Sequence, residues 1–478
     1  MRGIISAAGY LPYWRLERSA IGAFHGGRGS GTRTVASYDE DTTTLAVEAG
    51  RLALRGTTAE PETLWFSTSN PTYAEKTNAT VIHAALRLPA STAAFDSGSA
   101  VRSGVGALCA ALRSAEPTVL VTASDIRTGP ANSPDESAGG DAGTAILVGD
   151  DSAGGGAGAV IAEYVGGASI TREFLDRWRA PGEARTKGWE ERFGETQYLE
   201  LGMKAWIDAL AATGVGPAPG LDGTESQEAV DHVLIAGPHA RANNGLAKKL
   251  ARSASVDHTA TIGNAGAADA ALQLVTYLET AEAGKLVALI SLADGADVLI
   301  FRVTDAIEAY TPARSIADQI AAGNSGLPYN KFLAWRGTLV PNPPNRPEPA
   351  RSSASAAGRS IDWKFGFVGS KDRETGAVHL PPARVSFEGG NVDDMEPLPM
   401  ADATGTIQTF TIDRLAYSPS PPVIFAVVDF DGGGRLPVEI CDTTPDGIAV
   451  GDRVEMTFRR LNQSDGISNY FWKGRPVR

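Results

Sequence analysis

The sequence predicts an α/β protein built from two related halves, followed by a small all-β barrel. From residue 1 to about residue 305, short β-branched runs alternate with Ala-rich helical stretches. Within that region the order strand, helix, Gly-containing turn, apolar helix, strand occurs twice. After a Pro- and Ser-rich stretch, the rest of the chain contains short strands separated by Gly, Pro and Asp turns.

The α/β region contains six clear strand candidates and five clear helix candidates. Strands are expected at residues 63–69, 118–124, 144–150, 232–237, 286–294 and 298–303. Helices are expected at residues 42–54, 73–86, 101–115, 242–251 and 265–281. A Gly-containing turn precedes the apolar helix of each half, so we expect a cleft where the two turns meet.

The C-terminal third has a different pattern. A short helix is expected at residues 329–337, and the Pro-, Ser- and Ala-rich stretch VPNPPNRPEPARSSASAAG then forms an extended linker. Short strands with a Gly-marked hairpin over the last segment fit a small barrel. The expected divisions are an N-terminal half (1–160), a second half (161–306), a helix and linker (307–362), and a C-terminal domain (363–478).

Charge and composition exclude several classes of function. The net charge of −13, with no stripe of Lys and Arg, argues against nucleic acid or an anionic membrane as partner. The N-terminus lacks a secretory signal, and no run reaches the roughly 18 to 20 apolar residues that span a bilayer, so a cytoplasmic protein is expected. Cys109 and Cys441 lie in apolar runs and the six histidines are scattered, so no metal site is expected.

Three segments contain groups that could do chemistry. In GSAVRSGVGAL (98–108), a helix N-terminus could favour a polarised oxygen, although helix packing alone also explains its glycines. His239 follows a strand in IAGPHARANNG and could serve as a general base or oxyanion donor, or could cap the loop. Asn264 in TIGNAGAADAAL could donate to a thioester oxygen, or could be an ordinary turn residue.

Taken together, these segments resemble the thiolase superfamily, and in particular the 3-hydroxy-3-methylglutaryl-CoA (HMG-CoA) synthases and the initiating ketoacyl-ACP synthases. The matching pieces cover about two thirds of the chain and are, in order, GYLPYWRL, DEDTTTLAVEA, GDAGTAILVG, DRWRAPG, GPHARANNGLAKKL, GNAGAADAAL and SLADGADVLIF. The resemblance implies a duplicated five-layer fold in which His239 and Asn264 are the catalytic residues.

Two positions depart from that family. Its acyl-accepting cysteine stands at the start of the first apolar helix, where this chain has Val101, and its glutamate stands at a strand-end turn, where this chain has Ser69. The resemblance therefore implies no cysteine acyl-enzyme. Cys109 lies two helical turns further on and is expected to be a small buried hydrophobe. Ser99 or Ser103 is a poor replacement, because a serine hydroxyl needs an adjacent base.

The C-terminal region resembles the zinc-ribbon/OB-fold proteins that accompany thiolases and bind acyl-CoA. In that family two C-x-x-C pairs hold zinc, and the corresponding positions here are Asp372, Thr375, Ser386 and Gly389. A tetrahedral zinc site cannot be built from these side chains. We therefore expect no structural zinc, and a ribbon held by its PPAR hairpin and packing alone.

The two resemblances imply acyl-CoA as ligand, with coenzyme A as part of the substrate rather than a cofactor, a homodimer, and a thiolase-type partner protein. Two functions remain open. One is an acyltransferase-like or retro-aldol enzyme that acts on the carbon–carbon bond beside a CoA thioester, with His239 and Asn264 polarising the thioester and a Tyr or His taking the hydroxyl proton. The other is a catalytically inactive scaffold that channels acyl-CoA in a thiolase complex.

Overall fold

The computed structural model describes residues 1–151, 159–216 and 229–478, and it divides into two compact units. The first unit comprises Met1–Ala36, Glu48–Thr80 and Pro89–Tyr329. The second comprises Ser37–Val47, Val81–Leu88 and Asn330–Arg478. Among the described residues, no helix combines the length and the apolar character needed to cross a membrane.

A nine-stranded mixed sheet forms the centre of the first unit, in the order β11-β12-β13-β8-β1-β7-β6-β4-β5. Its strands from the N-terminal half are β1 (Arg2–Tyr10), β4 (Thr63–Ser67), β5 (Ala93–Asp96), β6 (Thr118–Asp125) and β7 (Ala142–Asp150). Those from the second half are β8 (Ala162–Ile170), β11 (His232–Ala236), β12 (Leu286–Leu292) and β13 (Ala296–Val303). Each half contributes one contiguous block of strands, with parallel pairs at the outer end and antiparallel pairs at the centre. The duplicated α/β fold expected from the sequence is confirmed.

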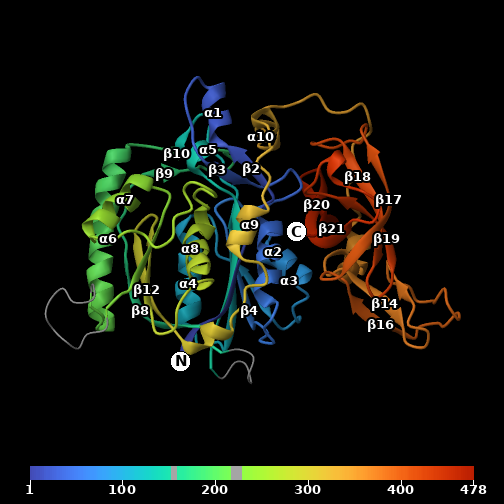
Figure 1. Ribbon diagram of the computed structural model, residues 1–478, viewed down its shortest axis with the longest axis horizontal. Coiled ribbons are helices and arrows are strands. Elements are labelled where there is room, and N and C mark those ends of the chain that lie inside the picture. The colour runs from blue at the N-terminus through green and yellow to red at the C-terminus, as the bar shows by residue number, and fades with distance from the viewer. Residues whose placement is uncertain (152–158, 217–228) are drawn as a thin grey trace. The chain divides into compact units, whose positions relative to one another are not determined.

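Two central helices, α4 (Arg102–Arg113) and α8 (Asp269–Leu278), pack against each other and share one hydrophobic core (Figure 1). Gly104 permits this close packing, because a Cβ atom there would lie 1.9 Å from the carbonyl oxygen of Ala267. Ala267 belongs to the short 3-10 turn η1 (Gly266–Ala268) that leads into α8. The two apolar helices predicted to follow the Gly-containing turns therefore meet at those turns.

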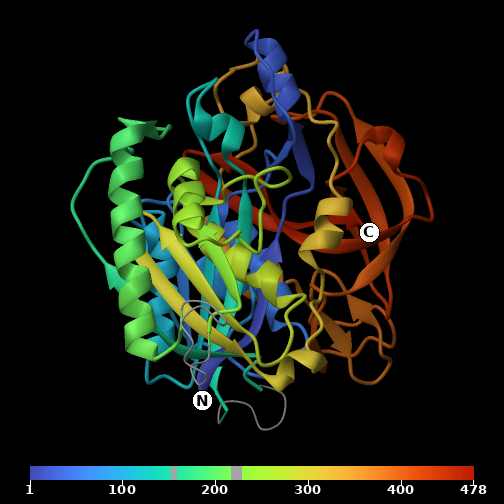
Figure 2. The same ribbon diagram turned by 60° about the vertical axis from the view of Figure 1, so that its left-hand side comes forward.

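Further helices complete the first unit. The long helix α6 (Glu191–Thr213) runs alongside strands β12 and β13 and shares a second core with them (Figure 2). Shorter helices are α1 (Arg18–Phe24), α5 (Pro134–Ala138), α7 (Ala240–Lys249) and α9 (Ile316–Ala321). Helix α2 (Thr42–Leu54) has the predicted bounds.

The helix expected at residues 73–86 is wrong in its first part, since α3 covers only Ala79–Ala85. The Asn78 side chain bonds both the N–H and the carbonyl of Tyr73, which closes a turn in place of a helical one. The carboxylate of Asp96 then accepts the N–H groups of Asn78 and Ala79, so helix α3 starts there.

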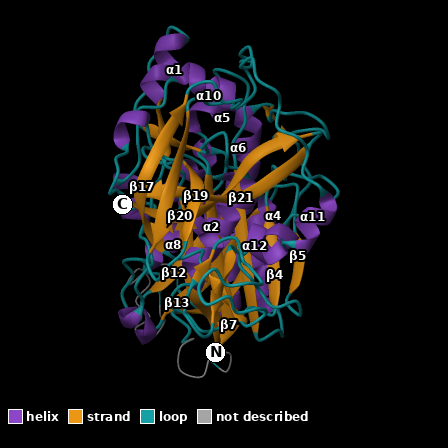
Figure 3. Ribbon diagram, turned by 90° about the vertical axis from the view of Figure 1, so that its right-hand side faces the viewer, coloured by secondary structure: helices purple, strands orange, loops and turns teal. Residues whose placement is uncertain are grey.

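The second unit contains a closed five-stranded barrel and a three-stranded ribbon. The barrel order is β17-β18-β19-β21-β20, and Figure 3 shows several of these strands in orange. Its strands are β17 (Thr404–Asp413), β18 (Val423–Phe430), β19 (Arg435–Ile440), β20 (Arg453–Ser464) and β21 (Ile467–Pro476). The ribbon has the order β15-β14-β16, from β14 (Val368–Asp372), β15 (Val378–His379) and β16 (Met395–Pro399). The predicted small barrel is confirmed, and the preceding stretch contains α10 (Tyr329–Trp335), α11 (Ala354–Arg359) and α12 (Ile361–Lys364).

A buried ionic cluster lies inside the second unit. Arg459 of β20 pairs with Glu40 at 2.9 Å and with Asp442 at 2.6 Å, and its guanidinium is fully buried. Lys473 of β21, also fully buried, pairs with Asp39 at 2.9 Å and with Glu439. The short segment Ser37–Val47 thus supplies acids to bases of the barrel strands, and each buried charge has a partner of opposite sign.

Candidate functional site

In the first unit, Asp125 at the end of β6 bonds two turns of the predicted site. The Oδ2 atom of this fully buried carboxylate accepts the N–H of Ala267 at 2.8 Å. Its Oδ1 atom accepts the N–H of Ser69 at 3.0 Å. Asp125 therefore connects the strand-end turn at Ser69 with the turn that follows Asn264.

Val101, which the sequence resemblance predicts at the nucleophile position, stands directly before helix α4. Its neighbour Arg102 is anchored in the second half of the sheet, since its Nε and Nη2 atoms bond the carboxylate of Asp297 at 2.9 and 3.2 Å. Cys109 is buried further along the helix, and burial raises the pKa of its thiol to about 11. At neutral pH this thiol stays protonated, so it cannot stand in for the missing nucleophile.

Ser69, at the position of the missing glutamate, is held by charged neighbours. Its hydroxyl bonds both oxygens of the Asp125 carboxylate, at 2.9 and 2.8 Å. Arg127 donates to the same hydroxyl at 3.4 Å, and Arg179 donates to the Ser69 carbonyl. A carboxylate is therefore present next to this turn, but it comes from Asp125 and its oxygens are already bonded.

His239 caps the N-terminus of helix α7. Its Nδ1 atom accepts the N–H of Ala242 at 3.1 Å, and its Nε2 atom lies 2.9 Å from the carbonyl oxygen of Glu191. Since a carbonyl only accepts, Nε2 donates to Glu191, while Nδ1 accepts from Ala242. Both nitrogens are therefore engaged within the protein, and a role for His239 as a base stays a prediction.

Asn264 is bonded in a similar way. Its Nδ2 atom donates to the carbonyl of Gly237 at 3.0 Å and to Oδ2 of Asp269 at 2.9 Å. Asp269 is almost fully buried, and burial raises the pKa of its carboxyl to about 6, against the lowering effect of the N–H groups of Ala265 and Gly237. Both amide protons of Asn264 are thus engaged while Asp269 is ionised, and its role as an oxyanion donor also stays a prediction.

A cavity of about 1000 Å³ adjoins Asn264 and Asp269. Helix α7, the loop after it, helix α8 and the end of β11 form its walls, and Arg18 of α1 also lines it. Neither Val101 nor Ser69 is among the described residues that line this cavity. The cavity therefore reaches the predicted catalytic amide without reaching the nucleophile position.

Sequence reasoning identified neither Asp269 nor Arg18. Asp269 lies in GNAGAADAAL, where it is the one acid within an apolar stretch, and a buried acid of this kind signals a special environment. Arg18 is in a short helix far from the other site residues in sequence and carried no comparable signal.

The ribbon of the second unit contains the four positions where the resembling family has zinc cysteines. Asp372 is fully buried, and hydrogen bonds from Ser386 and Asn391 hold the pKa of its carboxyl well below the usual range. The Thr375 hydroxyl donates to the same carboxylate at 2.8 Å. Three of the four positions therefore bond one another, with Asp372 at the centre.

This arrangement corrects one expectation. The ribbon is not held by its hairpin and packing alone, because the polar side chains at three of the four positions form hydrogen bonds with one another. Zinc does not fit the site, since Asp372 would be the one anionic ligand of the set and its oxygens are already bonded. Within the described residues, no three His, Cys, Asp or Glu side chains gather as a metal site.

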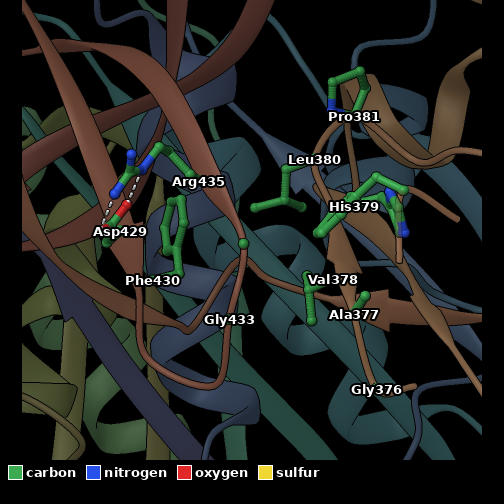
Figure 4. A pocket seen from close by; sticks show the side chains of 12 residues that line it. Gly376, Ala377, Val378, His379, Leu380, Pro381, Asp429, Phe430, Gly433 and Arg435 are labelled. Atoms are coloured by element: carbon green, nitrogen blue, oxygen red, sulfur yellow. Dashed lines mark hydrogen bonds and ion pairs between the residues drawn. The ribbon is translucent and has the colours of Figure 1, made fainter. Parts of the chain in front are cut away.

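A second cavity, of about 610 Å³, lies in the second unit between the ribbon and the β18–β19 hairpin (Figure 4). Val378, Leu380 and Phe430 supply apolar walls, and Arg435 at its margin is paired with Asp429. The Arg435 and Asp429 side chains are 64% and 35% exposed, so this is a surface ion pair.

Comparisons with known proteins agree with this two-part organisation. Over 339 residues the chain is 27% identical to the HMG-CoA synthase of Picrophilus torridus. The aligned region covers 65% of this chain and 90% of that protein. A crystal structure of an HMG-CoA synthase complexed with CoA aligns with a TM-score of 0.56 at 18% identity, covering 69% of this chain and 89% of that one.

The C-terminal region matches different proteins. The family described as "ChsH2, C-terminal OB-fold domain" matches residues 399–459. A DUF35 domain-containing scaffold protein of Methanothermobacter thermautotrophicus is 28% identical over 123 residues, which is 25% of this chain and 92% of that protein. The chain thus joins an HMG-CoA synthase-like region of the thiolase superfamily to a C-terminal OB-fold domain of the ChsH2 and DUF35 kind.

Proposed function

We propose that this protein handles acyl-CoA thioesters and cleaves or forms the carbon–carbon bond beside the thioester without a cysteine acyl-enzyme. The observation that carries the proposal is the pairing of Asn264 with Asp269 beside a cavity of about 1000 Å³. The sequence resemblance, which predicts Val101 at the nucleophile position, supports the absence of an acyl-enzyme. The names of the relatives, HMG-CoA synthases and a CoA-bound HMG-CoA synthase structure, support the choice of ligand.

Asp269 supplies the base in this proposal. A carboxyl group with a pKa of about 6 is mostly ionised at neutral pH and can accept a proton near its working pH. In the cleavage direction it takes the hydroxyl proton of a β-hydroxyacyl-CoA. The electron pair of the O–H bond forms the second bond of the new carbonyl, the Cα–Cβ bond breaks, and its electron pair forms the thioester enolate. The α-carbon of the enolate then takes the proton from Asp269, which returns to its ionised state.

Proton transfer to Asp269 also changes Asn264. A neutral carboxyl is a weaker acceptor than a carboxylate, so the Nδ2–H of Asn264 is released when Asp269 takes the proton. The freed amide can then donate to the enolate oxygen, and donors of this type contribute about 3 kcal/mol to the stabilisation of such a charge. The coupling makes the oxyanion donor available at the step that creates the negative charge.

The direct test uses the purified full chain and a β-hydroxyacyl-CoA. We expect release of the shortened acyl-CoA and the carbonyl product, a rate that rises with pH through about 6, and loss of both in Asp269→Asn. Asp208→Asn is the matched control, because Asp208 is a partly exposed acid on α6 that pairs with Lys204. An unchanged rate in Asp269→Asn would refute the assignment.

A second function is favoured by a specific observation. Both nitrogens of His239 and both amide protons of Asn264 are satisfied within the protein, as expected of groups that only hold the fold. In this alternative the chain is an inactive scaffold that channels acyl-CoA in a complex with a thiolase-type partner. It predicts no turnover by the purified chain and co-purification of an active thiolase.

We also infer a homodimer. Strand β5 lies at the end of the nine-stranded sheet, and Phe95 on it is 49% exposed. An edge strand of this kind presents unpaired backbone groups that a second copy can continue. Phe95→Asp should convert a dimer to a monomer in light scattering, and a wild-type monomer would contradict the inference.

A further inference from the structure

The ionic cluster of the second unit contains more acid than base. In the ion pairs of the described structure, the two buried cations are shared by four carboxylates, those of Asp39, Glu40, Glu439 and Asp442. The guanidinium of Arg459 lies between two of them, 2.9 Å from Glu40 and 2.6 Å from Asp442. The buried Oδ1 atom of Asp442 has no hydrogen-bond donor among the described residues. The cluster therefore holds uncompensated negative charge when all four acids are ionised.

An excess of buried negative charge favours a carboxyl group that keeps its proton. An unpaired buried charge is costly, so such a group tends to be neutralised instead. Burial raises the pKa of Glu40 to about 7 against the opposing effect of Arg459, and Asp442 and Asp39 add to the rise. Asp39 behaves differently because it contacts both cations. Against the raising effect of burial, Lys473 and Arg459 lower its pKa to about 2. The proton of the cluster therefore resides on Glu40.

Other titratable and charged groups surround Glu40. They come from its own segment, from β19 and the residues after it, from β20 and β21, and from the C-terminus, and are Tyr38, Asp39, Asp41, Glu439, Cys441, Asp442, Arg459, Arg460, Lys473 and Arg478. Cys441 and Tyr38 stay neutral near pH 7, because burial raises the pKa of both groups. The change of charge near neutral pH therefore falls on Glu40.

The segment Ser37–Val47, which contains Glu40, follows directly after a strand that holds the Asn264 turn. Two N–H groups of strand β3 (Thr32–Val35) donate to the carbonyls of Ala260 and Ile262, at 2.9 and 3.0 Å. A single residue separates this strand from the start of the segment. Release of the segment from the barrel strands would therefore remove a restraint on β3 and on the turn that β3 holds.

We propose that Glu40, Asp442 and Arg459 form a pH-sensitive latch. While Glu40 carries a proton, the segment Ser37–Val47 stays docked on the barrel strands and β3 holds the Asn264 turn. When Glu40 ionises, the segment opens locally and the turn loses that restraint.

The direction of the pH dependence follows from the two environments of Glu40. In an opened segment its carboxyl is in water and has the ordinary glutamate pKa of about 4.3. Docking raises this pKa, so the docked form is favoured most below the ordinary value and loses that contribution as pH rises through about 7. With one proton linked to docking, the docking equilibrium constant falls about tenfold between pH 6 and pH 8.

The test is hydrogen exchange of the full-length protein near pH 6 and near pH 8, followed by mass spectrometry and corrected for the intrinsic exchange rate at each pH. We expect protection in Ser37–Val47 to fall about tenfold at the higher pH, with a parallel fall in the turn from Ala260 to Asn264. Glu40→Gln has the same shape and cannot ionise, so this variant should lose both changes. An equal pH dependence in the wild type and Glu40→Gln would overturn the proposal.

Two further variants test the cause of the effect. Glu279→Gln is the matched control, because burial also raises the pKa of Glu279 to about 7 and its carboxylate accepts the N–H of Ile316. It should keep the wild-type pH dependence of Ser37–Val47. Asp442→Asn reduces the acid excess beside Arg459, so the loss of protection should become smaller and move to lower pH. Thermal unfolding near pH 6 verifies that each variant is folded, and an unchanged dependence in Asp442→Asn would refute the acid excess as the cause.

The Asn264 turn has a titrating neighbour of its own. Asp269 accepts the N–H of Ala265 at 3.1 Å, and burial raises the pKa of its carboxyl to about 6. This contribution remains in Glu40→Gln, so the difference between that variant and the wild type reports the latch. If Ser37–Val47 responds but the turn shows no such difference, the coupling to the turn is refuted. Exchange is measured without turnover, so failure of the proposed carbon–carbon chemistry leaves the latch intact.

Discussion

Two sets of buried polar side chains, one in each unit, are arranged differently. In the second unit, Arg459 and Lys473 are fully buried and each contacts carboxylates on more than one residue. In the first unit, Arg18 and Gln273 line a cavity, and each has buried polar atoms without a hydrogen-bond partner among the described residues. A buried charge that pairs with another side chain of the protein stabilises the fold. A buried polar side chain without a protein partner beside a cavity indicates a ligand.

The largest effect is expected from Arg459→Met. Removing this cation leaves Asp39, Glu40 and Asp442 buried with too little positive charge, and breaking a buried ion pair from one side typically costs about 3 to 5 kcal/mol. Chemical denaturation of the full chain should show this loss. The double variant Arg459→Met/Glu40→Gln should recover part of it, and no loss in the single variant would contradict the structural role.

A second prediction concerns the ribbon. Asp372→Ala removes the acceptor shared by Thr375, Ser386 and Asn391, so we expect faster proteolysis of the ribbon and a lower unfolding temperature. Treatment of the wild-type protein with a chelator should change neither quantity. A fall in unfolding temperature on chelation would show that the ribbon depends on a metal.

A third prediction is a pH dependence of stability. Burial raises the pKa of Glu40 to about 7, with Asp442 and Asp39 adding to the rise and Arg459 opposing it. The folded chain therefore keeps this proton at pH values where the unfolded chain has lost it. This contribution to stability is complete below the usual glutamate pKa and is lost as pH rises through about 7. Glu40→Gln should flatten the free energy of unfolding between pH 5 and 8 relative to the wild type, and an unchanged slope would refute the assignment.

The smallest and opposite effect is expected from Gln273→Met. The variant removes a buried Oε1 atom that has no partner among the described residues, together with the Nε2 hydrogen bond to Ile235, so stability should stay unchanged or rise by at most about 1 kcal/mol in the absence of ligand. Thermal unfolding of the variant and the wild type measures this change in stability. A clear destabilisation would mean that the Gln273 side chain stabilises the fold as the Arg459 side chain does. That result would contradict the proposed difference between the two units.

Much of the fold could be predicted from local patterns. The turn and helix around Val101, the strand before His239 and the buried helix after Asn264 all lie where periodicity and glycine placement predicted them. Helix α6 was not predicted, because its apolar residues in ERFGETQYLELGMKAWIDALAAT are interleaved with charged ones. The start of α3 was misplaced because one side chain, Asn78, closes a turn that no periodicity reveals.

The candidate site was predicted less completely. Residue types identified Val101, Ser69, His239 and Asn264, but not which of their atoms are already bonded. The Asn264 amide donates a hydrogen bond to Asp269 through the local fold of the turn, and Arg18 lines the same cavity from a distant part of the sequence. Such contacts cannot be predicted from the sequence pattern.

The central claim is carbon–carbon bond chemistry at a CoA thioester without a covalent intermediate. The most direct measurement incubates the purified chain with a β-hydroxyacyl-CoA, follows products by chromatography and examines the intact protein by mass spectrometry. The account predicts release of the shorter acyl-CoA with no acyl adduct. An adduct on Ser99 or Ser103, or no release by the folded protein, would contradict it.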